Sequence, residues 1–492
     1  MFKKLRGIFE NSYLSKTFSY LSLAQAVNAA AGFAVMTIFT RFLTPEDYGR
    51  VSMLWLFMTI LSVFIDFRLN TAFCIKFYKV SSEQQSRYLY VIIAFNFLAA
   101  LLAFFVWHSF PDVVVKFLQI QISYGEIGVV CLIGLTSVAT RLFGSLLIVS
   151  KEAKLYLGFS TLTTFVLIPA CIFFLFYLDY GYQSYLLGHL TAYAVMTAVG
   201  LVYAFKRYPP VGARILRFSD VKVLTRLSFP LIPDAFLMML LASAGRYFLN
   251  IYHGLAPVAV YSVGYMFANV FNTLILAPLG QAISPVLYEK HAVSEEQCCV
   301  YLETIMKYYW VLLSSLMLAC FTCFTELFPL LVGDRYGQAV DVMIILMLGL
   351  IISGGGSILS MMIVVKEKTH LVFLITLLSV AANVLASLLL IPDFGIYGAA
   401  FAGLTGYLFQ AIMVTIFTRR LVNINLNGAF LGKIIVLTGV TAVSYFFISR
   451  LDVEVYLKIV VKIAAFVLYL AVLSRLVGLK SMIAQKLATT DS

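Results

Sequence analysis

The chain has 492 residues, 62% of them hydrophobic and 12% charged, and its mean hydropathy is +0.96. A soluble core cannot bury so much apolar surface, so the composition excludes a soluble globular protein. The formal net charge of +12 would suit nucleic acid, but most of the 35 Lys and Arg lie between apolar runs, as in membrane proteins that follow the positive-inside rule, so we expect no nucleic-acid partner.

The apolar runs predict an all-α polytopic membrane protein with about 14 transmembrane helices, since each run has about the 20 residues that one span needs. They begin near Thr17, Arg50, Tyr88, Ile127, Leu155, Gln183, Ser228, Pro257, Thr304, Gln338, Thr369, Gly395, Phe430 and Val455. The first run continues to Thr40, longer than the apolar region of a signal peptide, so we expect it to remain as the first helix.

Charge placement predicts the orientation. With both termini on the cytoplasmic side, most Lys and Arg fall in inside segments, and the densest of these is 206–227. We expect this basic segment to lie against anionic lipid headgroups. Arg68, Arg141 and Arg246 lie within the apolar runs instead.

A sequence repeat divides the chain. Residues 214 positions apart match in the pairs Asp179/Asp393, Gly181/Gly395, Leu190/Leu404, Thr191/Thr405 and, conservatively, Tyr180/Phe394. Lys151-Glu152 also matches Lys366-Glu367, at an offset of 366 − 151 = 215 positions. An even number of spans per repeat predicts two parallel six-helix repeats around a central cavity, the plan of alternating-access transporters. We therefore expect two halves, 1–205 and 228–420, the linker 206–227, and an appended pair of helices with a cytoplasmic tail over 421–492.

Prolines and glycines mark candidate hinges. Pro230 and Pro233 open the seventh run, where each removes an intrahelical hydrogen bond. Gly354, Gly355 and Gly356 interrupt the tenth run, where a hinge and close helix packing are equally good interpretations.

No cofactor or metal is expected. Seven cysteines lie in or beside apolar runs or on the inside, which disfavours a disulfide framework, and the CxxC pair Cys320 and Cys323 has no neighbouring His or Cys. The sequence has no GxxxxGK[ST] loop, so ATP is not the expected driver.

Three motifs carry a family resemblance. The segment Arg41–Gly49 (RFLTPEDYG), the proline pair in Leu227–Pro233 and the segment Val260–Val263 (VYSV) resemble the corresponding positions of Wzx-type polysaccharide flippases of the multidrug/oligosaccharidyl-lipid/polysaccharide exporter superfamily. Family members often have Gly where this chain has Thr44 and Arg68. The resemblance implies a protein of the bacterial cell inner membrane. It would carry an undecaprenyl-pyrophosphate-linked oligosaccharide of O-antigen (lipopolysaccharide), capsule or exopolysaccharide to the periplasmic leaflet.

Such a substrate needs cations for its pyrophosphate, and arginine binds phosphate oxygens bidentately. Arg141, near the middle of the fourth run, is the strongest candidate, followed by Arg246 and Arg68. The alternative for Arg68 and Arg246 is that their side chains extend to the inner and outer headgroups.

Coupling to a proton or sodium gradient is implied by the resemblance. Candidate groups are Asp66, Asp234 and His189. The histidine has an alternative role, hydrogen bonding within the helix bundle. The expected partners are the lipid-linked oligosaccharide, membrane lipids and glycan polymerase or assembly proteins.

Two other functions stay open. A cation-coupled multidrug antiporter would share the two six-helix halves but favours acidic cavities. A membrane glycosyltransferase or O-antigen polymerase would need a large extramembrane loop or an acidic catalytic cluster. The longest outside loop, about 108–126, offers little of either, so the sequence predicts a transporter and no enzyme.

Overall fold

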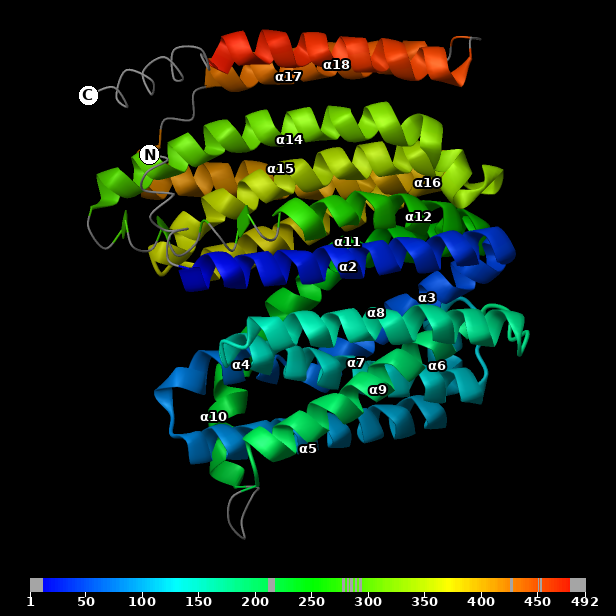
Figure 1. Ribbon diagram of the computed structural model, residues 1–492, viewed down its shortest axis with the longest axis vertical. Helices are drawn as coiled ribbons and strands as arrows, with labels where there is room; N and C mark the ends of the chain where they lie inside the picture. Colours follow the sequence, from blue (N-terminus) through cyan, green and yellow to red (C-terminus); the bar gives the residue numbers. More distant parts are fainter. Residues whose placement is uncertain are drawn as a thin grey trace. The chain divides into compact units, whose positions relative to one another are not determined.

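The computed structural model describes residues 12–210, 217–276, 279–280, 283, 286–287, 290–291, 294–424, 428–449, 451 and 454–477. Within these residues the chain is helical and contains no strand. The all-α membrane fold expected from the sequence is confirmed (Figure 1).

The helices follow one another with short connections. Their bounds are α2 Ser12–Phe42, α3 Pro45–Asp66, α4 Leu69–Lys76, η1 Phe77–Lys79, α5 Ser82–Ser109, α6 Pro111–Leu118, α7 Tyr124–Val149, α8 Ala153–Phe176, α9 Gln183–Arg207, α10 Phe218–Ser228, η2 Phe229–Leu231, α11 Ile232–His253, α12 Leu255–Phe271, η3 Asn272–Leu276, α14 Glu295–Val332, η4 Asp334–Tyr336, α15 Ala339–Val365, α16 Thr369–Leu421, α17 Gly428–Ser449 and α18 Val455–Val477.

Thirteen helical segments of the described chain are long and apolar enough to cross a membrane. One of them, His370–Leu421, has 52 residues. At 1.5 Å per residue it would extend about 78 Å, more than twice a hydrocarbon core. It is two helices joined across a non-helical residue, Gly395, and it contains two of the predicted runs. The expected count of fourteen spans stays a prediction.

The backbone repeats as well as the sequence. Gly181 and Gly395, 214 positions apart, both have left-handed φ values, +52° and +53°. The turns that follow α7 and α15 share one hydrogen-bonding pattern, in which Lys151 and Glu367 are the left-handed residues, with φ values of +65° and +58°. This is the Schellman arrangement of a helix end.

The pairing of Lys151-Glu152 with Lys366-Glu367 is therefore wrong by one residue. In the structure Lys151 corresponds to Glu367 and Glu152 corresponds to Lys368, because the amides of Glu152 and Lys368 each bond the carbonyl five residues earlier. At this turn the equivalent positions are identified by the backbone hydrogen bonds, and the identical Lys-Glu dipeptides suggested a register one residue away.

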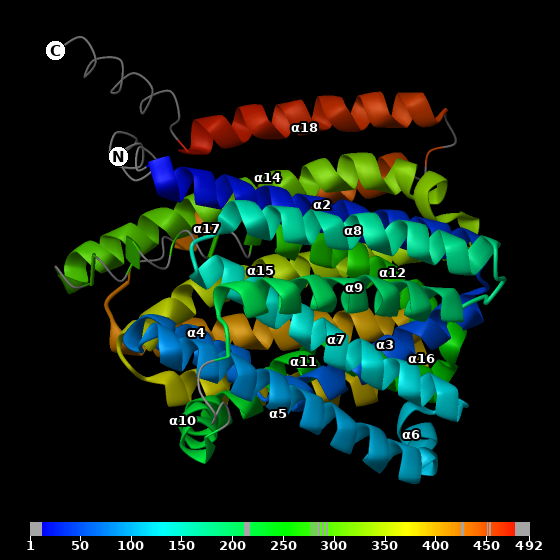
Figure 2. The same cartoon turned by 60° about the horizontal axis from the view of Figure 1, so that its bottom comes forward.

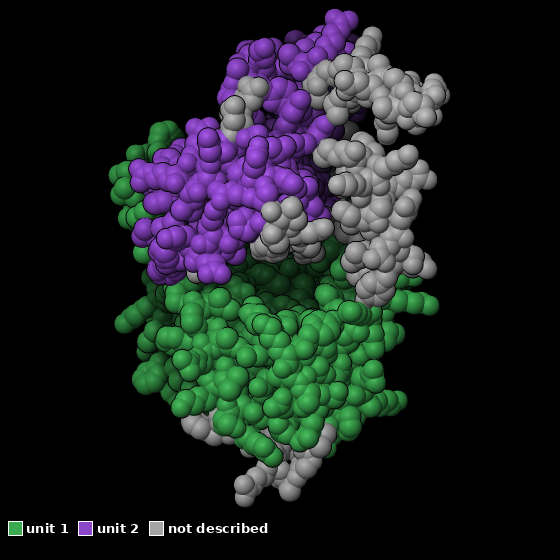
Figure 3. Space-filling view, turned by 90° about the vertical axis from the view of Figure 1, so that its left-hand side faces the viewer, with its two compact units in different colours: residues 1–263, 376–406 green, residues 264–375, 407–492 purple. Residues whose placement is uncertain are grey.

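The chain forms two compact units, coloured in Figure 3: unit 1 contains residues 1–263 and 376–406, and unit 2 contains residues 264–375 and 407–492. In unit 1, α7 packs on α3, α5 and α9, and α8 packs on α2 and α9, as Figure 2 shows. In unit 2, α17 and α18 pack on each other and on α14. These units are defined by compactness, whereas the predicted halves 1–205 and 228–420 are defined by the sequence repeat, and the two divisions need not coincide. The two halves therefore stay a prediction.

The hinge candidates lie in different settings. Pro230 is in η2 and Pro233 is in the first turn of α11, so both stand where the helix is interrupted. Helix α15 instead continues through Gly354–Gly356. A Cβ added at Gly354 would lie 2.3 Å from the Tyr309 hydroxyl, and one at Gly356 would lie 3.3 Å from the Cα of Ala411. These glycines allow close packing of α15 on α14 and α16, and their hinge role stays a prediction.

Candidate functional site

Unit 1 contains a cavity of about 500 Å³ between α2, α4, α7, α8 and α9. Arg141 from α7 and His189 from α9, both singled out in the sequence, line it. The other candidates, Arg68, Arg246 and Asp66, are in the same unit but do not line this cavity. No Asp or Glu is among the described residues of its wall. The cavity is therefore cationic and otherwise uncharged when the histidine is neutral.

Helix α7 presents a polar stripe to the cavity. Thr140, Arg141, Gly144, Ser145 and Ile148 line it, at spacings that place them on one face of a helix. The opposite face of α7 is buried, including residues 142, 143 and 146. A charge within a membrane span is costly unless it faces a polar cavity. Because Arg141 lies on the face of α7 that lines the cavity, its guanidinium is directed away from lipid.

Arg141 has no hydrogen bond or ion pair among the described residues, and it is exposed. It stands eight residues before the end of α7 at Val149, about 12 Å along the helix axis. Its five N–H donors are available to a ligand.

Polar side chains of neighbouring helices complete the wall. Ser160 on α8 donates to Oδ1 of Asn28 on α2 at 3.0 Å, and Asn70 on α4 donates from Nδ2 to Oγ of Ser145 at 3.0 Å. Each amide keeps donors or acceptors beyond these bonds. The cavity therefore offers neutral hydrogen-bonding groups beside one arginine.

The acidic candidate Asp66 lies close to this wall. It ends α3, and its carboxylate accepts the backbone N–H of Asn70 in the first turn of α4. The charge of Arg141 acts on this carboxylate more strongly than the charge of Arg68, which is only two positions away. The structure thus brings Asp66 and Arg141 together from different helices.

Arg68 is not on the second helix, where the sequence placed it. Phe67 and Arg68 are consecutive left-handed residues, with φ values of +47° and +54°, and they separate α3 from α4. The left-handed conformation costs a residue with a Cβ roughly 1–2 kcal/mol. The break explains why glycine suits this position.

A cluster of aromatic side chains continues from the cavity wall to residues that do not line the cavity. The His189 ring lies 4.4 Å from the Tyr185 ring, 4.7 Å from the Trp55 ring and 5.9 Å from the Tyr193 ring, between centroids. Arg141 is within electrostatic range of Tyr193, and Arg246 is within range of Tyr185. Sequence reasoning could not select these rings from the 42 Phe and 29 Tyr.

His189 is buried, and its Nδ1 lies 2.9 Å from the Tyr185 carbonyl oxygen. This contact is the hydrogen bond within the bundle that the sequence left as its alternative role. The remaining acid, Asp234, is in the first turn of α11 and is not part of the cavity wall. Coupling roles for both residues stay predictions.

Cys74 on α4 lies within electrostatic range of Asp66. Burial raises its pKa, and the negative charge of Asp66 raises it further. Raised pKa values make a thiol a poor nucleophile and metal ligand at neutral pH.

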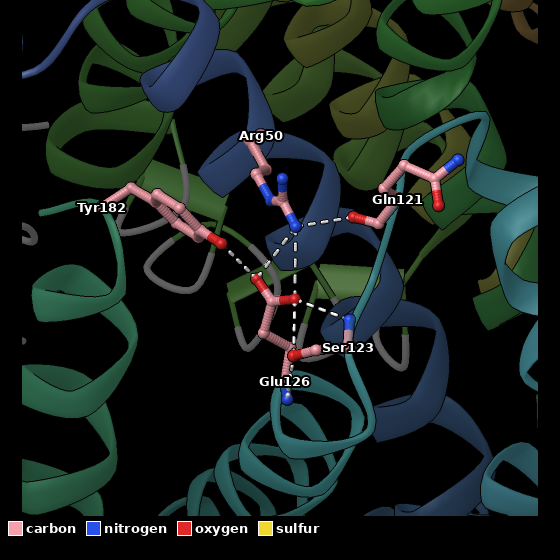
Figure 4. Close-up of polar contacts among 5 residues, drawn as sticks. All are labelled: Arg50, Gln121, Ser123, Glu126 and Tyr182. Carbon is pink, nitrogen blue, oxygen red and sulfur yellow. Dashed lines mark hydrogen bonds and ion pairs between the residues drawn. The ribbon is translucent and has the colours of Figure 1, made fainter. Parts of the chain in front are cut away.

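A polar network missed by the sequence reasoning joins three segments of unit 1 (Figure 4). The Glu126 carboxylate, 5% exposed, accepts from Nη2 of Arg50 at 3.2 Å, from the Tyr182 hydroxyl at 2.6 Å and from the Ser123 amide at 2.7 Å. Arg50 also donates to the Gln121 carbonyl at 2.6 Å. The network ties the starts of α3 and α7 to the turn before α9.

Part of this network has a local signal. Ser123 and Glu126 form a capping box, which the S-x-x-E spacing predicts. Arg50 and Tyr182 are distant in sequence and could not be assigned to it. Burial raises the pKa of Tyr182, and its hydrogen bond to the Glu126 carboxylate raises it further, so its hydroxyl stays a donor at neutral pH.

Comparisons with known proteins agree with this architecture. The family described as polysaccharide biosynthesis protein has a model that matches residues 14–291. The capsular polysaccharide biosynthesis protein CapF of Staphylococcus aureus is 22% identical over 409 residues, which cover 78% of this chain and 94% of that protein.

Two solved structures share the fold. The lipid II flippase MurJ in an inward closed conformation aligns with a TM-score of 0.73 at 14% identity, covering 92% of this chain and 98% of that one. An inward-facing multidrug resistance MATE family transporter of the MOP superfamily aligns with a TM-score of 0.64 at 14% identity, covering 80% and 94%. At these identities the likeness concerns the fold alone.

Proposed function

The chain belongs to the polysaccharide biosynthesis protein family, and on that premise we propose that it is a flippase for an undecaprenyl-pyrophosphate-linked oligosaccharide. The substrate moves from the cytoplasmic to the periplasmic leaflet of the bacterial inner membrane by alternating access, and both termini are cytoplasmic. The fold shared with a lipid II flippase supports the proposal. The chain is a multi-pass membrane protein.

The observation that carries the proposal is the charge of the cavity in unit 1. Arg141 faces it without a hydrogen bond or ion pair among the described residues, and no carboxylate lines it. Asp66 lies within electrostatic range of this guanidinium but forms no ion pair with it among the described residues. A guanidinium without an ion-pair partner within a membrane span is unfavourable unless an anion or water meets it. Its planar fork matches the phosphate oxygens of a pyrophosphate.

The rest of the wall suits the sugars. Amides and hydroxyls such as Asn28, Asn70 and Ser160 can exchange hydrogen bonds with sugar hydroxyls, and Tyr156 and Tyr193 supply aromatic surface. The polyprenyl tail needs no polar cavity because it stays dissolved in lipid.

A multidrug antiporter is the weaker alternative. A MATE family transporter shares the fold, but a cavity with an arginine and no carboxylate repels organic cations. We also infer transport without covalent catalysis, and coupling to a proton or sodium gradient through Asp66, Asp234 or His189.

The test is to follow the lipid-linked oligosaccharide in cells lacking this protein and any redundant flippase. Its leaflet is assigned by access to an externally added, membrane-impermeant sugar-binding probe. We expect inner-leaflet accumulation that re-expression reverses, while re-expression of Arg141→Ala leaves the accumulation in place. Normal appearance of the lipid-linked sugar on the outer side would reject the flippase.

A further inference from the structure

Unit 1 contains a second cavity, of about 560 Å³, which the transport path described above does not use. Its wall comes from three separate connections: residues 77–86 around the start of α5, residues 149–151 after α7, and residues 207–209 after α9. These are the ends of three candidate membrane spans, Ser82–Ser109, Tyr124–Val149 and Gln183–Arg207. The cavity therefore lies at the level where the hydrocarbon region gives way to headgroups.

The cavity wall carries two exposed cations. Lys151 occupies the left-handed position of the turn after α7, and its ammonium lies 5.7 Å from the centre of the Tyr78 ring. Arg207 is in the last turn of α9, and it has no hydrogen bond or ion pair among the described residues. The acid in the wall, Glu83, is 2.5 Å from the guanidinium of the buried Arg87. Arg87 also pairs with Asp220 at 3.3 Å, so it compensates the charge of Glu83 only in part. The described residues of the wall, with two cations and one carboxylate, keep a net positive charge.

Hydrogen bonds connect the remaining groups of the wall. The Tyr208 hydroxyl lies 2.7 Å from Oγ of Ser150, the Tyr78 hydroxyl donates to the Val149 carbonyl, and Gln85 donates to the Phe77 carbonyl at 2.7 Å. These bonds hold the three connections to one another. The wall thus combines aromatic, apolar and hydroxyl groups with the two cations Lys151 and Arg207.

We propose that this cavity binds the phosphate group of an anionic membrane lipid, with Lys151 and Arg207 as its ligands. Phosphates are the anions found at this depth of a bilayer, and basic pockets between helix ends are suited to such headgroups. Arg207 supplies a planar fork and Lys151 a point charge. The aromatic and apolar part of the wall meets the glycerol and the first methylenes of the lipid. The site is separate from the cavity of Arg141.

The test measures binding of short-chain phosphatidylglycerol to the full-length detergent-solubilised protein by native mass spectrometry. Phosphatidylcholine of equal chain length and inorganic phosphate serve as competitors. We expect saturable binding of phosphatidylglycerol, and a Kd about thirtyfold weaker in Lys151→Gln/Arg207→Gln, from about fivefold per cation. That change equals about 2 kcal/mol at 1.4 kcal/mol per tenfold.

A matched control removes two exposed lysines of unit 1 that lie outside the cavity wall and outside the basic segment 206–227, as Lys116→Gln/Lys154→Gln. This control, in which Lys116 lies on α6, should bind phosphatidylglycerol as the unaltered protein does, and Lys151→Arg should keep most of the affinity. Equal weakening in the control pair, or unchanged binding in the cavity pair, would overturn the proposal. Displacement by inorganic phosphate at concentrations equal to the lipid would identify a free-phosphate site and overturn the lipid assignment.

Discussion

Replacing Arg141 by alanine tests the site most directly. The side chain is exposed in the cavity and has no hydrogen bond or ion pair among the described residues. Its loss therefore removes no packing from the buried face of α7, and the thermal unfolding temperature should stay unchanged or rise slightly. Any loss of transport then reports a lost contact with the substrate.

The size of the effect follows from the geometry. A bidentate arginine makes two charge-assisted hydrogen bonds to phosphate, and hydrogen bonds to charged groups contribute about 1.5–3 kcal/mol each. Losing about 3 kcal/mol corresponds to a transport rate about 150-fold lower at subsaturating substrate. Arg141→Lys keeps the charge but loses the planar fork, so we expect it to remain at least about tenfold below the unaltered protein.

The assay uses proteoliposomes containing lipid-linked oligosaccharide extracted from cells lacking the protein. The initial rate at which the sugar becomes accessible to an impermeant probe is compared for the two variants and the unaltered protein. Arg335→Ala is the matched control, because this arginine is exposed in η4 and does not line the cavity. A rate for Arg141→Ala within threefold of the unaltered protein, at equal incorporation, would refute the role assigned to Arg141.

Three further predictions concern stability and are measured by thermal or denaturant unfolding in detergent. Arg68→Gly should stabilise the protein by about 1 kcal/mol, since it relieves a left-handed residue, whereas Arg68→Ala should not, and equal effects would contradict the strain. Glu126→Gln should cost about 3 kcal/mol because it breaks a buried pair, and the exposed control Glu46→Gln should cost less than about 0.5 kcal/mol. Gly200→Ala would place a Cβ 2.1 Å from a phenylalanine ring and should cost about 1–3 kcal/mol, whereas Gly158→Ala meets nothing within 4 Å and should be neutral or stabilising; similar values for the two would refute the packing argument.

The sequence determined the features that depend on residues close together in the chain. Apolar runs of about 20 residues predict spans wherever they occur, because the bilayer itself imposes that length. Gly181 and Gly395 match in the sequence repeat, and the backbone has a positive φ at both positions. The proline pair at 230 and 233 predicted a helix interruption, which the structure contains. Arg141 stood out because a charge in mid-span is costly wherever the helix goes.

Only the tertiary structure decided which of these residues meet. Asp66 approaches Arg141 across 75 positions of sequence, and the His189 ring packs against the rings of Trp55 and Tyr185, because α3, α7 and α9 pack against one another. The Arg50–Glu126–Tyr182 network likewise joins the starts of α3 and α7 to the turn before α9. Helix periodicity gives the face on which a side chain lies, but it does not give the neighbour of that face. The neighbour is set by the packing of distant helices, and in this chain that packing placed an arginine in a cavity whose described wall contains no carboxylate.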